Sequence, residues 1–378
     1  MDNQNKYNLF QQIYCLSVAA NIVSQHEGSE ETLQNAMKQS LDKVLPVLLG
    51  DWAISWGPRV FKARNKDSPE GGPDNVWFAA VSQSQKVCVV AIAGTAPNSW
   101  ADMQQDFGIY KVVDFNAWVE QWSPEGIPKP QTHTPDNSSE ISYCAKGTCI
   151  GVWNVLSNLG AAAGESLRID QYLDRLDSSY TIVVTGHSLG GALAPIVALG
   201  LYTANMTGAY TNNIKVLASA GVSPGNEKLA TDFAAAFPKE PESAEDYQVY
   251  NMNYYNEFDV VPQAWSIRPN DDRNLYNILS KILRFSKDLY PWADALLKIA
   301  IRLSKASKIQ YASLPGQKFT GPPLPEQIKS WKELEDVIRE QHLRSYWRQI
   351  GITDFMKLFE HRFRLEIKPG EEQAEAKQ

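Results

Sequence analysis

The sequence contains little cysteine and little histidine. Its four cysteines lack the paired spacing of a zinc site, and only Cys144 and Cys149 are close enough in sequence to close a small loop. Nothing else indicates a disulfide framework, so we interpret all four as buried or incidental thiols. The patterns that would hold a metal ion are absent, and we expect neither a metal nor a cofactor.

A long apolar run is also missing. A helix that crosses a membrane needs about 18 consecutive apolar residues, and the chain contains no such stretch. The N-terminal residues lack the basic start and unbroken apolar segment of a secretory signal, and residues 16–23 are interpreted as the first helix of the fold. We therefore expect a cytoplasmic protein by default, with secretion by a signal-independent route left open.

Basic residues do not outnumber acidic ones. The chain has 36 Lys and Arg against 43 Asp and Glu, which gives a formal charge of -7. A field of that sign disfavours nucleic acid as a general partner. Hydrophobic residues make up 43% of the chain and charged residues 21%, which is typical of a globular protein and excludes a disordered one. The oligomeric state is not indicated.

Short apolar runs rich in β-branched residues predict strands, and a helical pattern follows one of them. The run over 181–186 has no polar alternation, as expected of a strand buried on both faces, and residues 189–202 after it have helical spacing. Strands that alternate with helices predict an α/β fold with a mainly parallel central sheet flanked by helices. The other predicted strands are 76–83 and 86–94, which form a hairpin or lie side by side, and 214–219 and 247–253.

We expect one domain over residues 1–367 and a flexible charged tail over 368–378. Residues 123–149 are rich in Pro, Ser and Thr, which predicts a long loop or flap. Residues 270–325 are interpreted as a mainly helical insertion in the connectivity of the sheet, and its last part, 312–325, contains several prolines and glycines that break regular structure.

The segment 182–194, IVVTGHSLGGALA, raises the question of whether Ser188 is a nucleophile. A serine on a sharp strand-to-helix turn needs small residues two positions before and after it, and Gly186 and Gly190 are placed there. The alternative is an ordinary serine in a structural turn. The buried strand before the motif and the helix after it favour the nucleophile, and we expect Pro195 to bend that helix without breaking it.

A nucleophilic serine needs a base and an acid that orients the base. When such a serine lies on a strand-to-helix turn of an α/β sheet, the acid and then the base follow it along the chain. Two histidines follow Ser188. We favour His342, near the end of a predicted helix and before aromatic residues, over His361. For the acid we favour Asp259, which follows an apolar strand, over two rivals in a polar run, Asp271 and Asp272.

The developing oxyanion needs two backbone N–H donors. One is expected from Leu189, the residue after the nucleophile. The other is expected from Thr95, because Gly94 ends a predicted strand and Thr95 offers both its amide and its hydroxyl. The alternative for this Gly-Thr pair is a helix cap.

These residues resemble the class 3 lipases, the fungal triacylglycerol lipase-like α/β-hydrolases. The resemblance covers roughly residues 70–265 and rests on GT at 94–95, TGHSLGGALA at 185–194, SPGN at 223–226 and NEFDVVP at 256–262. It implies an α/β-hydrolase fold, a triad of Ser188, Asp259 and His342, and an oxyanion hole at Thr95 and Leu189. It also implies hydrolysis of lipid esters without a cofactor.

Residues 281–308 bear on the question of lipid contact, because they hold seven basic and two acidic residues, and Lys298, Arg302 and Lys305 among them recur at helical spacing beside apolar residues. A basic amphipathic helix of this kind lies on a lipid surface or packs on its own domain with a charged outer face. Our hypothesis is that this segment, together with the flap at 123–149, forms a lid over Ser188.

The leading interpretation is a serine hydrolase that cleaves acyl esters of glycerolipids through an acyl-enzyme intermediate. Two alternatives stay open. One is phospholipase A1 activity, including that of an exported antibacterial lipase effector. The other is a catalytically silent binding protein with the same fold.

Overall fold

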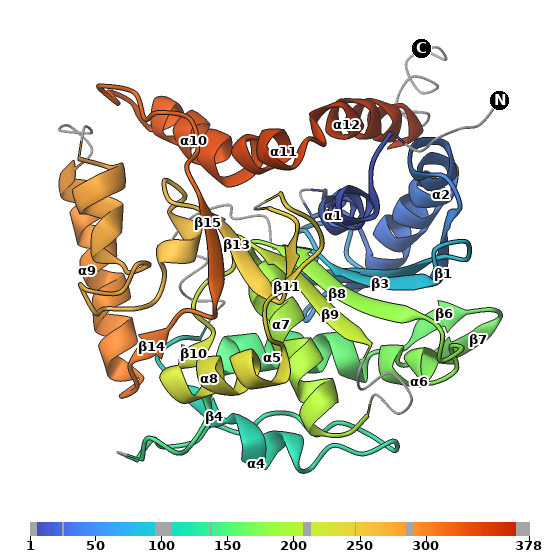
Figure 1. Ribbon diagram of the computed structural model, residues 1–378, viewed down its shortest axis with the longest axis horizontal. Helices are drawn as coiled ribbons and strands as arrows, with labels where there is room; N and C mark the ends of the chain where they lie inside the picture. The colour runs from blue at the N-terminus through green and yellow to red at the C-terminus, as the bar shows by residue number, and fades with distance from the viewer. Residues whose placement is uncertain are drawn as a thin grey trace.

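The computed structural model describes residues 6–24, 26–94, 108–136, 138–206, 213–245, 247–284 and 290–367, except the side chains at 290 and 362–367. The centre is a seven-stranded sheet (Figure 1). Its order is β1 (Trp52–Phe61), β2 (Asn75–Ser82), β3 (Val87–Ile92), β8 (Thr181–His187), β9 (Ile214–Ser219), β13 (Met252–Asn256) and β15 (Gly316–Phe319). From β3 onward neighbouring strands are parallel, and β1 and β2 extend the sheet antiparallel. This is the predicted α/β fold with a mainly parallel sheet.

Helices cover both faces of the sheet, as Figure 1 shows. On one face lie α1 (Leu9–Ala19) and α2 (Glu30–Leu49), with α12 (Thr353–Ile367) packed on them. On the other lie α5 (Lys146–Ser157) and α7 (Leu189–Thr203). Side chains of β8 are buried on both faces of the sheet. Val183 lies in the hydrophobic cluster on the α1 face, and Ile182 and Val184 lie in the cluster on the α7 face.

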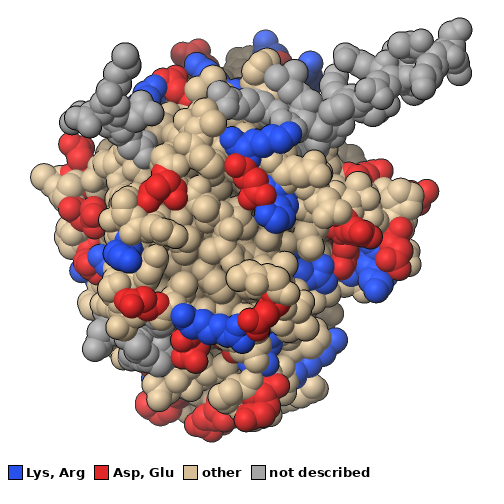
Figure 2. Space-filling model, turned by 90° about the vertical axis from the view of Figure 1, so that its right-hand side faces the viewer, with Lys and Arg blue, Asp and Glu red and all other residues tan. Residues whose placement is uncertain are grey.

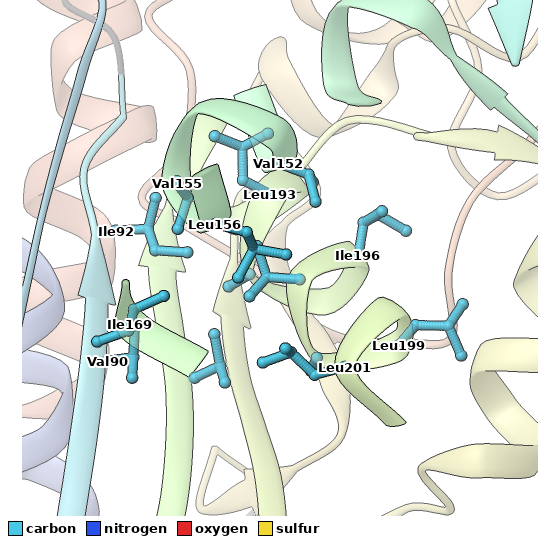
Figure 3. Packing of buried hydrophobic residues seen from close by; sticks show 14 of the residues in the cluster. Val90, Ile92, Val152, Val155, Leu156, Ile169, Leu193, Ile196, Leu199 and Leu201 are labelled. Carbon is cyan, nitrogen blue, oxygen red and sulfur yellow. The ribbon is translucent and has the colours of Figure 1, made fainter. Parts of the chain in front are cut away.

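Figure 3 shows the α7 side of the core, in which Val90 and Ile92 of β3 belong to the same hydrophobic cluster as Leu193 and Ile196 of α7. All four side chains are buried. This packing fixes the start of α7 relative to the ends of β3 and β8, and the end of β8 is where Ser188 lies.

The remaining elements lie around this core. The strands are β4 (Val112–Asp114), β5 (Tyr143–Ala145), β10 (Gly225–Asn226) and β14 (Tyr311–Ala312) of a four-stranded sheet, β6 (Gly160–Ala162) paired with β7 (Glu165–Leu167), and β11 (Glu240–Pro241) paired with β12 (Val249–Tyr250). The helices are α4 (Phe115–Val119), α6 (Ile169–Leu173), α8 (Glu227–Ala236), the 3₁₀ turn η2 (Val261–Gln263), the π-helices η3 (Ile278–Ile282) and η4 (Glu340–Arg344), α9 (Tyr290–Ala306), α10 (Trp331–Arg339) and α11 (Ser345–Ile350).

Most of the predicted elements occur where the sequence patterns put them. The hairpin β2–β3, the strands β8 and β9 and the helix α7 match, and α7 runs on through Pro195. The predicted strand 247–253 is divided into β12 and β13, because Asn251 between them has a positive φ of 65°. The first helix starts earlier than the predicted 16–23, since Asn8 and Gln11 form a capping box at its N-terminus.

Two predicted segments, the loop and the mainly helical insertion, contain strands that the sequence did not indicate. The predicted loop 123–149 is shorter than expected, because β5 begins at Tyr143 and α5 at Lys146. The predicted insertion 270–325 includes β15, the edge strand of the central sheet, within its proline-rich end. An edge strand tolerates flanking prolines, and the carbonyl of Pro315 accepts a hydrogen bond from the N–H of Asn253 on β13 at 2.8 Å.

Surface charge is mixed on the face that Figure 2 shows, where Lys and Arg are interspersed with Asp and Glu. Over the described ranges, no helix combines the length and the apolar character needed to cross a membrane. The boundary between a domain over 1–367 and a tail over 368–378 stays a prediction, and the tail lies outside the described residues.

Candidate active site

Ser188 lies at the turn between β8 and α7, in a strained conformation. Its φ is 62° and its ψ is -121°, a combination that non-glycine residues rarely adopt. The neighbouring glycines make the turn possible: a Cβ on Gly186 would lie 2.3 Å from the carbonyl of Gly190, and one on Gly190 would lie 2.1 Å from the carbonyl oxygen of Ile92. The small residues are therefore required by close backbone packing around Ser188.

Asp259 is held in the loop that follows β13. Its side chain is fully buried, and its Oδ1 accepts a hydrogen bond from the N–H of Val261 at 3.0 Å. Because a buried carboxylate is unfavourable unless its lone pairs are satisfied, this loop has to supply donors. Gln263 supports the same loop, since its side-chain amide lies 3.3 Å from the carbonyl of Asp259.

His342 comes to Asp259 from the π-helix η4, which bulges between α10 and α11. Its Nδ1 lies 2.8 Å from Oδ2 of Asp259, and the imidazole is almost completely buried. A carboxylate only accepts hydrogen bonds, so Nδ1 carries a proton and Nε2 is the ring nitrogen that is left to act on a substrate or a nucleophile. The structure thus brings together two residues that lie far apart in the sequence.

His342 lies next to the turn because its ring packs against that of His187, the residue before Ser188. The rings of His187 and His342 lie 4.7 Å apart between centroids. Nδ1 of His187 is 2.9 Å from the hydroxyl of Ser219 and 3.4 Å from that of Tyr14. Burial, and then the nearby His342, lower the pKa of His187 well below 6.5, so this ring stays neutral beside His342.

The predicted oxyanion-hole residues are described in part. Leu189 is the first residue of α7, so its N–H belongs to the helix N-terminus, where donors are free to bind an anion. Thr95 lies outside the described residues. Its neighbour Gly94 is anchored, because its N–H donates to Oδ1 of Asn21 at 2.7 Å.

The rival residues are engaged elsewhere. Asp271 accepts hydrogen bonds from Ser266 at 2.7 Å and from Arg268 at 2.9 Å. Asp272 accepts a hydrogen bond from the hydroxyl of Tyr255. His361 is exposed on α12.

Sequence reasoning missed three residues that support this site: Tyr14, Asn21 and Tyr346. Tyr346 donates to Asp259 at 2.8 Å and follows His342 by four residues, a spacing that places two side chains on one helical face. The aromatic run after His342 was a signal for it. Tyr14 and Asn21 come from the N-terminal helical region, and no local pattern links them to a site so distant in sequence.

Metal chemistry has no candidate site in the part of the chain that is described, since no three His, Cys, Asp or Glu side chains are grouped to hold an ion. The four cysteines are buried as free thiols. What the site offers is a strained serine, a buried Asp–His pair and helix N–H donors, which together suit acyl transfer.

A comparison with protein families gives a match over part of the chain. Residues 139–268 match the family model described as lipase (class 3). The resemblance to the class 3 lipases is confirmed. The matched segment contains Ser188 and Asp259 and ends before His342.

Comparison with solved structures supports the lipase-like fold. M37 lipase is similar to this chain with a TM-score of 0.66 and 22% sequence identity, over 92% of this chain and 95% of the other. The nonglycosylated LIP2 lipase of Yarrowia lipolytica has 17% identity and a TM-score of 0.43 over 69% of this chain and 75% of its own. Lipase II of Rhizopus niveus has 15% identity and a TM-score of 0.40 over 68% and 74%. A search of the curated proteins found no significant match.

The packing of Gly190 against Ile92 gives a first prediction. Gly190→Ala places a methyl group against a backbone carbonyl that the sheet holds in place, so we expect it to lower the free energy of unfolding by about 3 kcal/mol. Gly126→Ala is the matched control, because a Cβ there meets nothing within 4 Å. Urea unfolding of both variants checks this, and equal midpoints would contradict it.

The neutral state of His187 gives a second prediction. Because its pKa is lowered on folding, the unfolded chain binds a proton that the folded chain does not, and stability is lost as the pH falls below about 6.5. His187→Asn removes this contribution. Between pH 7.5 and 5.5, we expect the wild type to lose about 1 kcal/mol more stability than the variant. Urea unfolding at both pH values measures this, with exposed His361→Asn as control; parallel curves for His187→Asn and wild type would refute it.

Proposed function

We propose that this protein hydrolyses acyl esters of glycerolipids, with Ser188 as nucleophile, His342 as general base and Asp259 as the acid that orients it. The observation that carries the proposal is the buried Asp259–His342 pair at 2.8 Å, with its imidazole against the residue that precedes Ser188. The class 3 lipase match makes lipid esters the substrate class to expect.

In the proposed reaction, Oγ of Ser188 attacks the ester carbonyl carbon while Nε2 of His342 takes the hydroxyl proton. The carbonyl oxygen becomes an oxyanion, which accepts hydrogen bonds from the N–H groups of Leu189 and Thr95. His342 then gives the proton to the leaving alcohol as the C–O bond breaks. Water, deprotonated by His342, attacks the acyl-serine ester, and the fatty acid leaves with Ser188 restored.

Helix α9 is the part that we propose to contact lipid. Its inner face is buried, with Leu297 and Ala300 in the cluster that also contains Val260 and Val261 of the loop after Asp259. Its outer face is mixed: Trp292 is 66% exposed and Ile299 is 46% exposed. The basic residues Lys298, Arg302 and Lys305 are exposed on the same helix.

This arrangement combines the two behaviours that the sequence allows for a basic amphipathic helix. The inner face packs on the domain, and the outer face presents aromatic, aliphatic and basic side chains of the kind that bind an anionic lipid surface. The basic outer face also favours a second candidate function, phospholipase A1 activity on anionic phospholipids. We also propose that α9 forms part of a lid over Ser188.

The catalytic assignment predicts which side chains are needed for hydrolysis of p-nitrophenyl esters with acyl chains from C2 to C16. Ser188→Ala and His342→Ala should each lower kcat by at least about a thousandfold, because nucleophile and base act as one unit. His361→Ala is the matched control and should keep wild-type activity. An active Ser188→Ala, or an inactive His361→Ala beside an active His342→Ala, would overturn the assignment.

The silent-protein alternative is tested in the same preparation with a fluorophosphonate probe. Labelling of the wild type and not of Ser188→Ala would exclude it. Hydrolysis of triacylglycerol emulsions compared with phosphatidylglycerol vesicles then separates a triacylglycerol lipase from a phospholipase A1.

The proposed lipid-binding face of α9 predicts a chain-length effect. Replacing Trp292 and Ile299 together by Asp removes apolar area from the outer face, so hydrolysis of emulsified C16 esters should fall about tenfold while the soluble C4 ester is unaffected. Leu159→Asp is the control, since Leu159 is 52% exposed beside β6, at the opposite side of the molecule from α9 (Figure 1). An unchanged preference between C16 and C4 would refute lipid contact through α9.

A further inference from the structure

Tyr346 is buried at the back of the Asp259–His342 pair. Its side chain is fully excluded from solvent, and its ring packs edge-on against Phe319 at 5.0 Å and Tyr254 at 6.4 Å between centroids. These aromatic contacts leave the ring one orientation, so the hydroxyl points at a fixed place. That place is Oδ2 of Asp259, at 2.8 Å.

The direction of the phenolic hydrogen bond follows from its other partner. The backbone N–H of Asn256 lies 3.0 Å from the same hydroxyl. An amide N–H can only donate, so the phenol oxygen accepts there and its single proton goes to Asp259. Burial, and then the charge of Asp259, raise the pKa of Tyr346 well above its ordinary value, which keeps that proton in place.

Local helix geometry brings Tyr346 and His342 to the same carboxylate oxygen. The π-helix η4 carries His342 and is followed directly by α11, which carries Tyr346. Nδ1 of His342 and the hydroxyl of Tyr346 each lie 2.8 Å from Oδ2 of Asp259, while Val261 occupies Oδ1. Oδ2 of Asp259 therefore accepts two hydrogen bonds, one from the imidazole of His342 and one from the phenol of Tyr346.

We propose that Tyr346 is a positioning residue for the catalytic pair, which fixes Oδ2 of Asp259 and takes up part of its negative charge, and so limits how strongly that carboxylate stabilises the imidazolium of His342. The inference rests on the proposed function of Asp259 and His342. The phenol acts through the carboxylate and touches neither the substrate nor Ser188 in this scheme.

The other titratable groups near the Asp259–His342 pair have different partners or are neutral. His187 of β8 faces His342 and is kept neutral by its burial. Tyr14 of α1 lies behind His187, and burial raises its pKa. Arg273 acts electrostatically on Tyr346 from the loop before η3, but its guanidinium packs over the ring of Tyr255, with 4.4 Å to the centroid.

The test is the pH profile of Tyr346→Phe, which removes the hydroxyl and keeps the ring. Without the phenol, more negative charge on Oδ2 stabilises the imidazolium of His342, so the acidic limb of kcat/KM should move to higher pH by about half a unit. Activity should fall about threefold at pH 6 and return to near the wild-type value at pH 9.

The matched control is Tyr311→Phe. The Tyr311 hydroxyl is equally buried and donates to the carbonyl of Ile109 at 2.7 Å, so this variant loses one buried phenolic hydrogen bond away from the pair. Its pH profile should coincide with that of the wild type. A loss in Tyr346→Phe that is the same at every pH, or a limb that moves to lower pH, would overturn the inference.

The rate of fluorophosphonate labelling against pH gives the same profile without an ester substrate. This separates the two proposals. A wild type that labels at Ser188 with parallel profiles for Tyr346→Phe would remove only the role of Tyr346. A wild type that neither labels nor hydrolyses esters would remove the proposed function itself.

Discussion

The buried carboxylate of Asp259 is the constraint on which the rest of the site depends. A charge at a position with no solvent contact is tolerated only when donors surround it, and here they come from three places: Val261 in its own loop, His342 in η4 and Tyr346 in α11. Supplying them requires a π-bulge in the C-terminal helices and an ordered loop after β13. The orientation of His342 therefore follows from the need of the buried Asp259 carboxylate for hydrogen-bond donors.

A second constraint acts around Ser188, where the backbone of the turn packs directly against the backbone of the neighbouring strands. Gly190 lies against Ile92 of β3, and Gly191 lies against Ser219 of β9, with room in neither place for a side chain. The strain of Ser188 is therefore maintained by the sheet on both sides of β8. Serine and Asp–His pair are held by different physical means, close packing in one case and hydrogen bonding of a charge in the other.

Local patterns predict the parts of this molecule whose causes are local. The apolar run of β8, the glycines of the turn and the aspartate after β13 are each visible within a dozen residues, and the choice of His342 over His361 followed from its neighbours. The π-helix was not predictable, because its cause is a partner on another segment. Nor was the strand β15 inside a proline-rich stretch, since its pairing with β13 is non-local. Asn21 and Tyr14 were missed for the same reason.

The wide separation of the site residues along the chain has a consequence for synthesis. A ribosome completes β8 and the strained turn long before it reaches η4, so Ser188 and Asp259 emerge well before His342 and Tyr346 are made. Tyr14 of the N-terminal helix and Ser219 of β9, whose hydroxyls lie 3.3 Å apart, are also made before η4. We expect the Asp259–His342 pair to form only when these last helices dock, so the complete arrangement around Ser188 exists only in the finished protein.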